Sequence, residues 1–133
     1  MIVLDTNIVL DLFVFEDPST EPLLMALQQG TLRWIATAAM REELERVLAY
    51  PQIVKSLTYH ARNATAVLER FDALVATQAE APKASVTCKD PDDQKFIDLA
   101  VAHKAMLLSK DNAVLCMHKR LLALGVAAQI ALT

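Results

Sequence analysis

The chain has 133 residues, of which 54% are hydrophobic and 22% are charged, and its formal net charge at pH 7 is −3. This length predicts a single domain over residues 1–133, and the apolar content excludes a disordered chain. Charged or glutamine side chains interrupt every apolar run well short of about 18 residues, which excludes a membrane-spanning helix, and no secretory signal follows Met1, so we expect a cytoplasmic location.

The first half of the chain alternates short apolar runs with stretches of helical periodicity. These predict, in chain order, a strand over 2–4, a helix over 8–15, a turn over 16–20, a helix over 22–29, a strand over 32–36 and a helix over 38–49. Pro22 suits the start of a helix, Gly30 its end and Thr37 an N-cap. Pro51 is expected to stop the last of these helices.

The second half continues the alternation. It predicts one or two helices over 56–78, a loop or short strand over 81–89, a helix over 91–104, a strand over 105–108, a helix over 112–124 and a last strand over 126–132. Asp90 is expected to cap the helix that starts at Pro91, and Gly125 to close the helix before the last strand. Strands that alternate with helices of this length predict βαβ units, hence an α/β fold whose parallel sheet has helices on both faces.

Two aspartates come directly after predicted strands. Asp5 follows the first strand, and Asp111 lies just past the strand near residues 106–109. Ligands of parallel sheets bind outside the carboxyl ends of the strands, so both side chains are expected at the same edge. Either residue alone would be explained as a helix N-cap. Together they indicate a site.

A third acid, Asp93, lies in an acidic helix start that also contains Asp90 and Asp92. The helix macrodipole favours negative charge there, which explains Asp90 and Asp92 well. Asp93 differs because, at about 100° per residue, it lies on the same stripe as Phe96 and Ile97. Burying a carboxylate is costly unless a positive group is nearby, so the pattern favours Asp93 over Asp92 as a functional acid.

The fourth acid, Glu43, lies in the third predicted helix. Met40 and Leu44 belong to the apolar stripe of this helix, and Glu43 is the glutamate nearest its edge, whereas Glu42 and Glu45 face solvent. Two interpretations of Glu43 stay open from this geometry: a member of a solvated charge run, or a residue of the site.

Four acids that converge on one sheet edge predict a metal site; they are Asp5, Glu43, Asp93 and Asp111. Two carboxylates about 4 Å apart repel by about 4 kcal/mol at an effective dielectric of about 20, so such a cluster either retains protons or binds a cation. Oxygen ligands without neighbouring His or Cys select Mg²⁺ or Mn²⁺ over zinc. A divalent ion lowers the pKa of a water molecule that attacks phosphorus and stabilises the developing charge. Whether one or two ions bind stays open.

The glycine content and the net charge exclude or disfavour two ways of binding phosphate groups. Gly30 and Gly125 are the only glycines, which excludes glycine-rich phosphate loops. The negative net charge argues against a general basic face for nucleic acid. Five cations could still flank a path for phosphates: Arg41, Arg46, Lys89, Lys95 and Lys110.

Four segments of the sequence resemble the PIN-domain family: residues 3–9 (VLDTNIV), 43–48 (ELERVL), 90–100 (DPDDQKFIDLA) and 108–111 (LSKD). Their order and spacing cover nearly the whole chain, and the likeness is closest to the toxin-like (VapC-like) bacterial branch. The resemblance implies a three-layer α/β/α sandwich with a central, mainly parallel sheet. It also implies an Mg²⁺- or Mn²⁺-dependent endoribonuclease that acts on RNA, often as the toxin paired with a small antitoxin protein.

Carried over by position, the catalytic and metal-binding acids of the family fall on Asp5, Glu43, Asp93 and Asp111. Asn7 and Ser109 occupy places where the family often has a polar residue close to these acids. The resemblance also implies that Asp111 matters least for the metal, because this acid lies nearer the sheet edge in the family.

Two other functions remain open from the sequence. A catalytically weak or inactive PIN-like module would act by binding RNA or protein, although four converging acids favour an enzyme. A phosphatase or phosphoaspartate receiver would use Asp5 as nucleophile and Lys110 as phosphate anchor, but no second acid follows Asp5 as that phosphatase chemistry requires. The apolar segment over 121–132 predicts core structure, with a homodimer face as the alternative.

Overall fold

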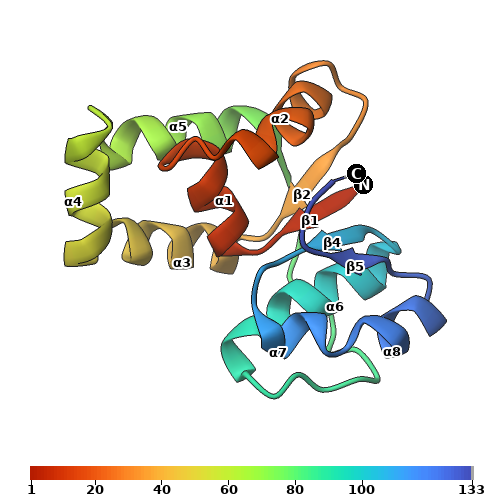
Figure 1. The fold of residues 1–133 in the computed structure, drawn as a ribbon. Helices are drawn as coiled ribbons and strands as arrows, with labels where there is room; N and C mark the ends of the chain where they lie inside the picture. Colours follow the sequence, from red (N-terminus) through yellow and green to blue (C-terminus); the bar gives the residue numbers. More distant parts are fainter. Residues whose placement is uncertain (133) are drawn as a thin grey trace.

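The computed structural model describes residues 1–132 and contains one sheet of parallel strands in the order β3-β2-β1-β4-β5 (Figure 1). The strands are β1 (Ile2–Leu4), β2 (Trp34–Ala36), β3 (Val75–Thr77), β4 (Met106–Leu108) and β5 (Ala128–Gln129). The chain extends the sheet from β1 in one direction and then returns to add β4 and β5 on the other side. Ligands of such sheets bind where this direction reverses. Here the reversal point lies between β1 and β4.

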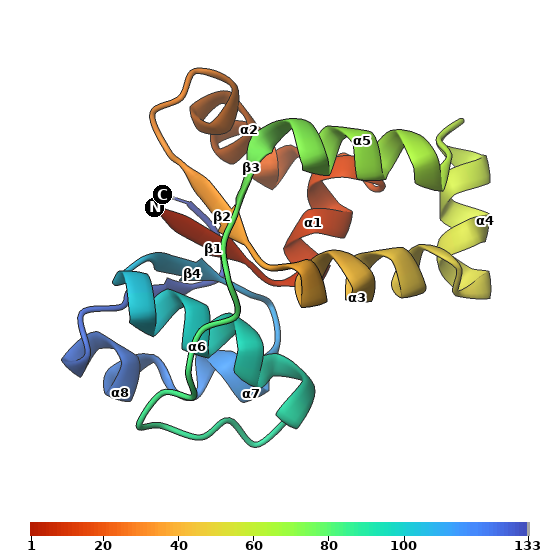
Figure 2. The same cartoon turned by 180° about the vertical axis from the view of Figure 1, so that it is seen from behind.

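Helices cover both faces of the sheet, with α1, α2 and α5 on one face and α6, α7 and α8 on the other (Figures 1 and 2). Together with α5, helices α3 and α4 extend beyond the sheet. The helices are α1 (Thr6–Phe13), α2 (Glu21–Gln28), α3 (Ala38–Leu48), α4 (Pro51–Tyr59), α5 (Ala64–Leu74), α6 (Gln94–His103), α7 (Asn112–Leu115) and α8 (His118–Ala123). Two 3₁₀ turns, η1 (Pro18–Thr20) and η2 (Pro91–Asp93), precede α2 and α6. The expected three-layer α/β/α sandwich is confirmed. Within residues 1–132, no helix has the length and hydrophobicity that crossing a membrane requires.

The central strands β1 and β2 are buried throughout, as expected for a parallel sheet covered on both faces. Trp34 of β2 packs against Phe13 of α1 and Phe71 of α5, with ring centroids 5.9 and 5.0 Å apart. Large aromatic side chains contribute much of the apolar area of a core. This core fixes β1 and α1, and with them the junction that contains Asp5.

Most predicted elements are confirmed, but the prediction for residues 56–78 is wrong in part. The segment contains part of α4, all of α5 and the strand β3, which follows α5 without a loop. Strand β3 has three residues, which are half-buried or exposed at the edge of the sheet. Such a short run shows no apolar pattern that distinguishes it from the end of the preceding helix. Pro51 not only ends α3 but also begins α4, where its missing N–H has no cost. Residues 81–89 form a loop.

Three further expectations are corrected. The helix over 112–124 is divided at Met117, whose backbone is not helical (φ −93°, ψ 5°) and whose side chain is buried. The last strand covers only Ala128–Gln129 rather than 126–132. Thr37 does precede α3 in an extended conformation, but its side chain makes no capping hydrogen bond.

Lys104 ends α6 in the left-handed conformation (φ 50°, ψ 43°), where glycine is usual. Lys104→Gly is expected to stabilise the fold by about 0.5–1 kcal/mol, because the left-handed conformation costs other residues about 1–2 kcal/mol while glycine adds freedom to the unfolded chain. Urea denaturation measures the change. The control Lys119→Gly, within α8, is expected to lose about 1 kcal/mol. A Lys104→Gly variant less stable than the wild type would contradict this prediction.

Candidate metal centre

The structure brings three of the predicted acids from separate parts of the chain to the reversal point between β1 and β4. Asp5 follows β1 and Asp111 lies shortly after β4, so both stand at the carboxyl ends of neighbouring parallel strands. Asp93 is the last residue of η2, which leads into α6. Each acid offers one carboxylate oxygen, and these three oxygens all lie within 4.8 Å of one another.

Asp5 is 4% exposed, and both of its carboxylate oxygens accept hydrogen bonds. Oδ1 accepts from the Thr6 N–H at 2.7 Å as the N-cap of α1, and Oδ2 accepts from the Ser109 hydroxyl at 2.6 Å. Burial raises the pKa of Asp5, the charges of Glu43 and Asp111 raise it further, and the two hydrogen bonds oppose this. Asp5 is therefore both a helix cap and a member of the acidic group.

Asp93 is a buried acid with an unsatisfied oxygen. It is 7% exposed, and among residues 1–132 its buried Oδ2 atom has no hydrogen-bond partner. Burial raises the pKa of Asp93 to about 8, and the neighbouring carboxyl groups of Asp111 and Asp5 add to the effect. A buried acceptor without a partner costs about 1–3 kcal/mol, more for a charged group. This arrangement favours binding of a group that takes carboxylate oxygens as ligands.

Asp111 is half-buried and begins α7, where its Oδ1 accepts a hydrogen bond from the Ala113 N–H at 2.9 Å. The Asp111 N–H in turn donates to the hydroxyl oxygen of Ser109 at 2.9 Å. The fully buried Ser109 therefore links the carboxylate of Asp5 to the backbone of Asp111. Asn7 lies at the rim, where its Oδ1 accepts from the Lys110 N–H at 3.3 Å.

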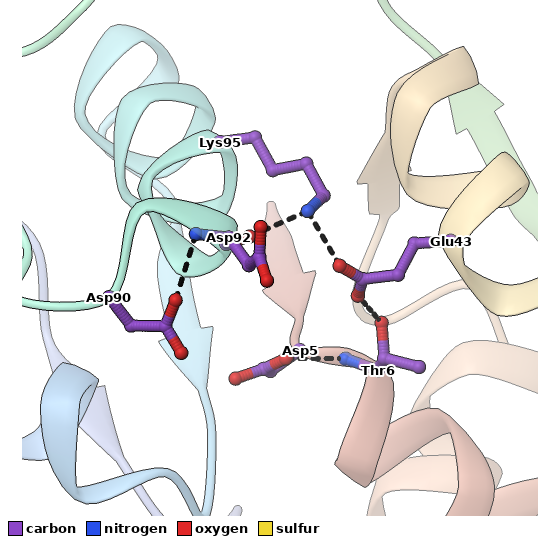
Figure 3. A network of polar contacts seen from close by, with 6 residues as sticks. All are labelled: Asp5, Thr6, Glu43, Asp90, Asp92 and Lys95. Carbon is purple, nitrogen blue, oxygen red and sulfur yellow. Dashed lines mark hydrogen bonds and ion pairs between the residues drawn. The ribbon is translucent and has the colours of Figure 1, made fainter. Parts of the chain in front are cut away.

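Glu43 is not a member of this group of three aspartates. Its side chain contacts Thr6, the residue that follows Asp5 (Figure 3). It is half-buried at the edge of the apolar stripe of α3, while the other glutamates of α3 are exposed. Oε1 of Glu43 accepts from Nζ of Lys95 at 2.7 Å, and Oε2 accepts from the hydroxyl of Thr6. Because Thr6 adjoins Asp5, Glu43 is coupled to the acidic group through this hydroxyl.

The cations that the sequence placed near the acids have different partners. Arg41 donates two hydrogen bonds to Asp72, at 2.8 and 2.9 Å, and Lys110 pairs with the buried Asp11 at 2.5 Å. Arg46 and Lys89 are exposed. Of the five predicted cations, Lys95 is the one that forms an ion pair with a predicted site acid.

Sequence reasoning missed Thr6, and it did not connect Lys95 with Glu43. Thr6 is buried and its hydroxyl orients Glu43. The available signal was a hydroxyl residue directly after Asp5, at the start of an otherwise apolar helix. The contact between Lys95 and Glu43 joins residues far apart in the sequence, so no local pattern predicts it.

The residues of this site fit a divalent ion of the Mg²⁺ or Mn²⁺ type. The atoms that the three aspartates offer to a metal ion are all carboxylate oxygens, which hard cations prefer as ligands. The unsatisfied Oδ2 of Asp93 would gain a partner. A cation would also offset the burial and the neighbouring carboxyl groups, which together raise the pKa of Asp93.

Acids at the carboxyl ends of the central strands of a parallel α/β sandwich define a candidate metal-binding site. A family model described as PIN domain matches residues 1–113, and the chain therefore belongs to the PIN-domain family. PIN domains are generally nucleases, they typically use divalent metals, and PIN nuclease domains bind RNA. No match was found among curated proteins.

Proposed function

We propose that residues 1–133 form a single PIN nuclease domain, an endoribonuclease that hydrolyses RNA phosphodiester bonds with the aid of Mg²⁺ or Mn²⁺. Asp5, Asp93 and Asp111 would hold the ion, and Glu43 is the fourth acid of the site. When bound, the ion supplies an activated water molecule and stabilises negative charge that develops on the phosphate. The role of Ser109 is to hold the Asp5 carboxylate in place by its hydrogen bond.

The observation that carries this proposal is the buried, unsatisfied Oδ2 of Asp93 beside two other carboxylates. Helix capping accounts for Asp5 and Asp111, each of which accepts a backbone N–H. Capping does not account for this oxygen of Asp93. An acid whose pKa is about 8 is protonated at neutral pH unless a cation replaces the proton.

Removal of the metal is expected to stop RNA cleavage. EDTA should reduce the rate by at least about 100-fold, and an excess of Mg²⁺ or Mn²⁺ over the chelator should restore it, because the activated water depends on the ion. Gel assays on tRNA and mRNA measure the rate, with EDTA already saturated by Mg²⁺ as the control. Undiminished cleavage in free EDTA would refute metal dependence. RNA binding without cleavage under every metal condition would instead indicate a binding module.

We also propose that this nuclease is the toxin of a toxin–antitoxin pair and acts in the cytoplasm, where its RNA substrates are. The support is the resemblance to the toxin-like branch. Coexpression with the product of an adjacent small reading frame should give a stable complex in which cleavage is blocked. Light scattering of the free chain reports whether it forms a homodimer.

A further inference from the structure

Glu43 differs from Asp93 because both of its carboxylate oxygens already have partners (Figure 3). Oε1 accepts from the ammonium of Lys95 at 2.7 Å, and Oε2 accepts from the hydroxyl of Thr6. The side chains of Glu43 and Lys95 are only 17% and 23% exposed, so solvent screens this pair less than a surface ion pair. Asp5 also has partners on both oxygens, but it belongs to the group of acids whose oxygens lie within 4.8 Å of one another, and Glu43 does not. The Lys95 ammonium, moreover, already neutralises the charge of Glu43.

Lys95 is held in this place by η2 and by the start of α6. Its Nζ also donates to the backbone oxygen of Asp92 at 2.6 Å and lies 4.9 Å from the centroid of the Phe96 ring. The 3₁₀ turn η2, which contains the buried Asp93, therefore also positions the Lys95 ammonium beside Glu43. The result is a positive charge at a fixed position on the Glu43 side of the acidic group.

We propose that the ammonium of Lys95 takes the place of a second divalent ion, so that the centre binds one ion through Asp5, Asp93 and Asp111. Glu43 is then a positioning residue for Lys95 rather than a ligand of the ion. This inference rests on the proposed function, because it requires that the three aspartates bind a divalent ion.

Electrostatics favour a single ion. A second divalent ion at Glu43 would lie next to the Lys95 ammonium, and like charges repel strongly at such short range in a partly buried site. The resemblance to the family implies instead that Glu43 is a ligand, and the two assignments predict different binding data.

Calorimetric titration of the full chain with Mn²⁺ separates these assignments. We expect one ion per wild-type chain and no saturable binding by Asp93→Asn. Lys95→Met frees the Glu43 carboxylate and should tighten Mn²⁺ binding by about tenfold. The double variant Glu43→Gln/Lys95→Met removes both charges of the pair, so it should still bind one ion with an affinity within about threefold of the wild type.

Two exposed positions provide matched controls. Glu42→Gln makes the same chemical change in α3, and Lys119→Met makes the same change as Lys95→Met but in α8. Both should retain the wild-type stoichiometry and affinity. Lys95→Arg keeps the positive charge and should also bind one ion, and circular dichroism establishes that each variant is folded.

Each outcome of this titration has a defined meaning. A folded double variant that loses Mn²⁺ binding as Asp93→Asn does would overturn the inference, since Glu43 would then be a ligand. Two ions per wild-type chain would also overturn it, and both results would leave the proposed function intact. A wild-type chain without saturable Mn²⁺ binding would overturn the proposed function and this inference with it.

Discussion

Replacing Asp93 by Asn is expected to reduce metal-dependent RNA cleavage by at least about 100-fold. The amide keeps the shape of the side chain but lacks the negative charge and one of the two acceptor oxygens. The fold should persist, because a neutral amide is less costly to bury than a carboxylate. Gel assays with Mn²⁺ in excess measure the activity, and circular dichroism measures the fold.

Asp92→Asn is the matched control, because it makes the same change at the preceding, exposed residue. Its activity should remain close to that of the wild type. Asp5→Asn should behave like Asp93→Asn, since both side chains belong to the group of three aspartates. Full activity in Asp93→Asn together with loss in Asp92→Asn would assign the functional acid to Asp92 instead.

The metal-free chain is expected to become less stable as the pH rises from about 4 to about 8. The pKa of Asp93 is about 8 in the folded chain and about 3.9 when unfolded. Between these values the folded state holds a proton that the unfolded state has released, so a rise in pH favours unfolding. The free energy of unfolding should fall by up to about 1.4 kcal/mol per pH unit across this window. The raised pKa of Asp5 acts in the same direction.

Urea denaturation in EDTA between about pH 5 and pH 8 measures this dependence. Asp93→Asn removes the titrating group and should flatten the curve, so that the variant becomes more stable than the wild type at pH 8. Excess Mn²⁺ should stabilise the wild type at that pH by about 2.7 kcal/mol at a hundred times its dissociation constant. A metal-free wild type whose stability rises with pH over this window would contradict the prediction.

The sheet and the position of the acids were largely predictable because they depend on local patterns. A buried strand that stops at an acid places this acid at a strand end, which is how Asp5 and Asp111 were found. Asp93 was distinguished from Asp92 by helical periodicity, and the structure buries Asp93 and exposes Asp92. The α-helical periodicity predicted the burial of Asp93 correctly, although Asp93 belongs to a 3₁₀ turn and not to the α-helix that follows.

The features that were not predicted depend on tertiary contacts. Strand β3 has three residues and follows α5 directly, so its pairing with β2 decides its conformation. For Glu43, the helix wheel gave no preference between a solvated charge and a site residue. Its environment is set by Lys95 and Thr6, which reach it from α6 and α1. No spacing within a single helix indicates such contacts.

The parallel pairing of β1 with β4 joins two segments that are far apart in the sequence. Contacts of high sequence separation form slowly, because the intervening chain loses entropy when its ends meet. Asp5 and Asp111 therefore come together only when β4 pairs with β1. A folding intermediate that lacks this pairing would have no assembled group of three aspartates.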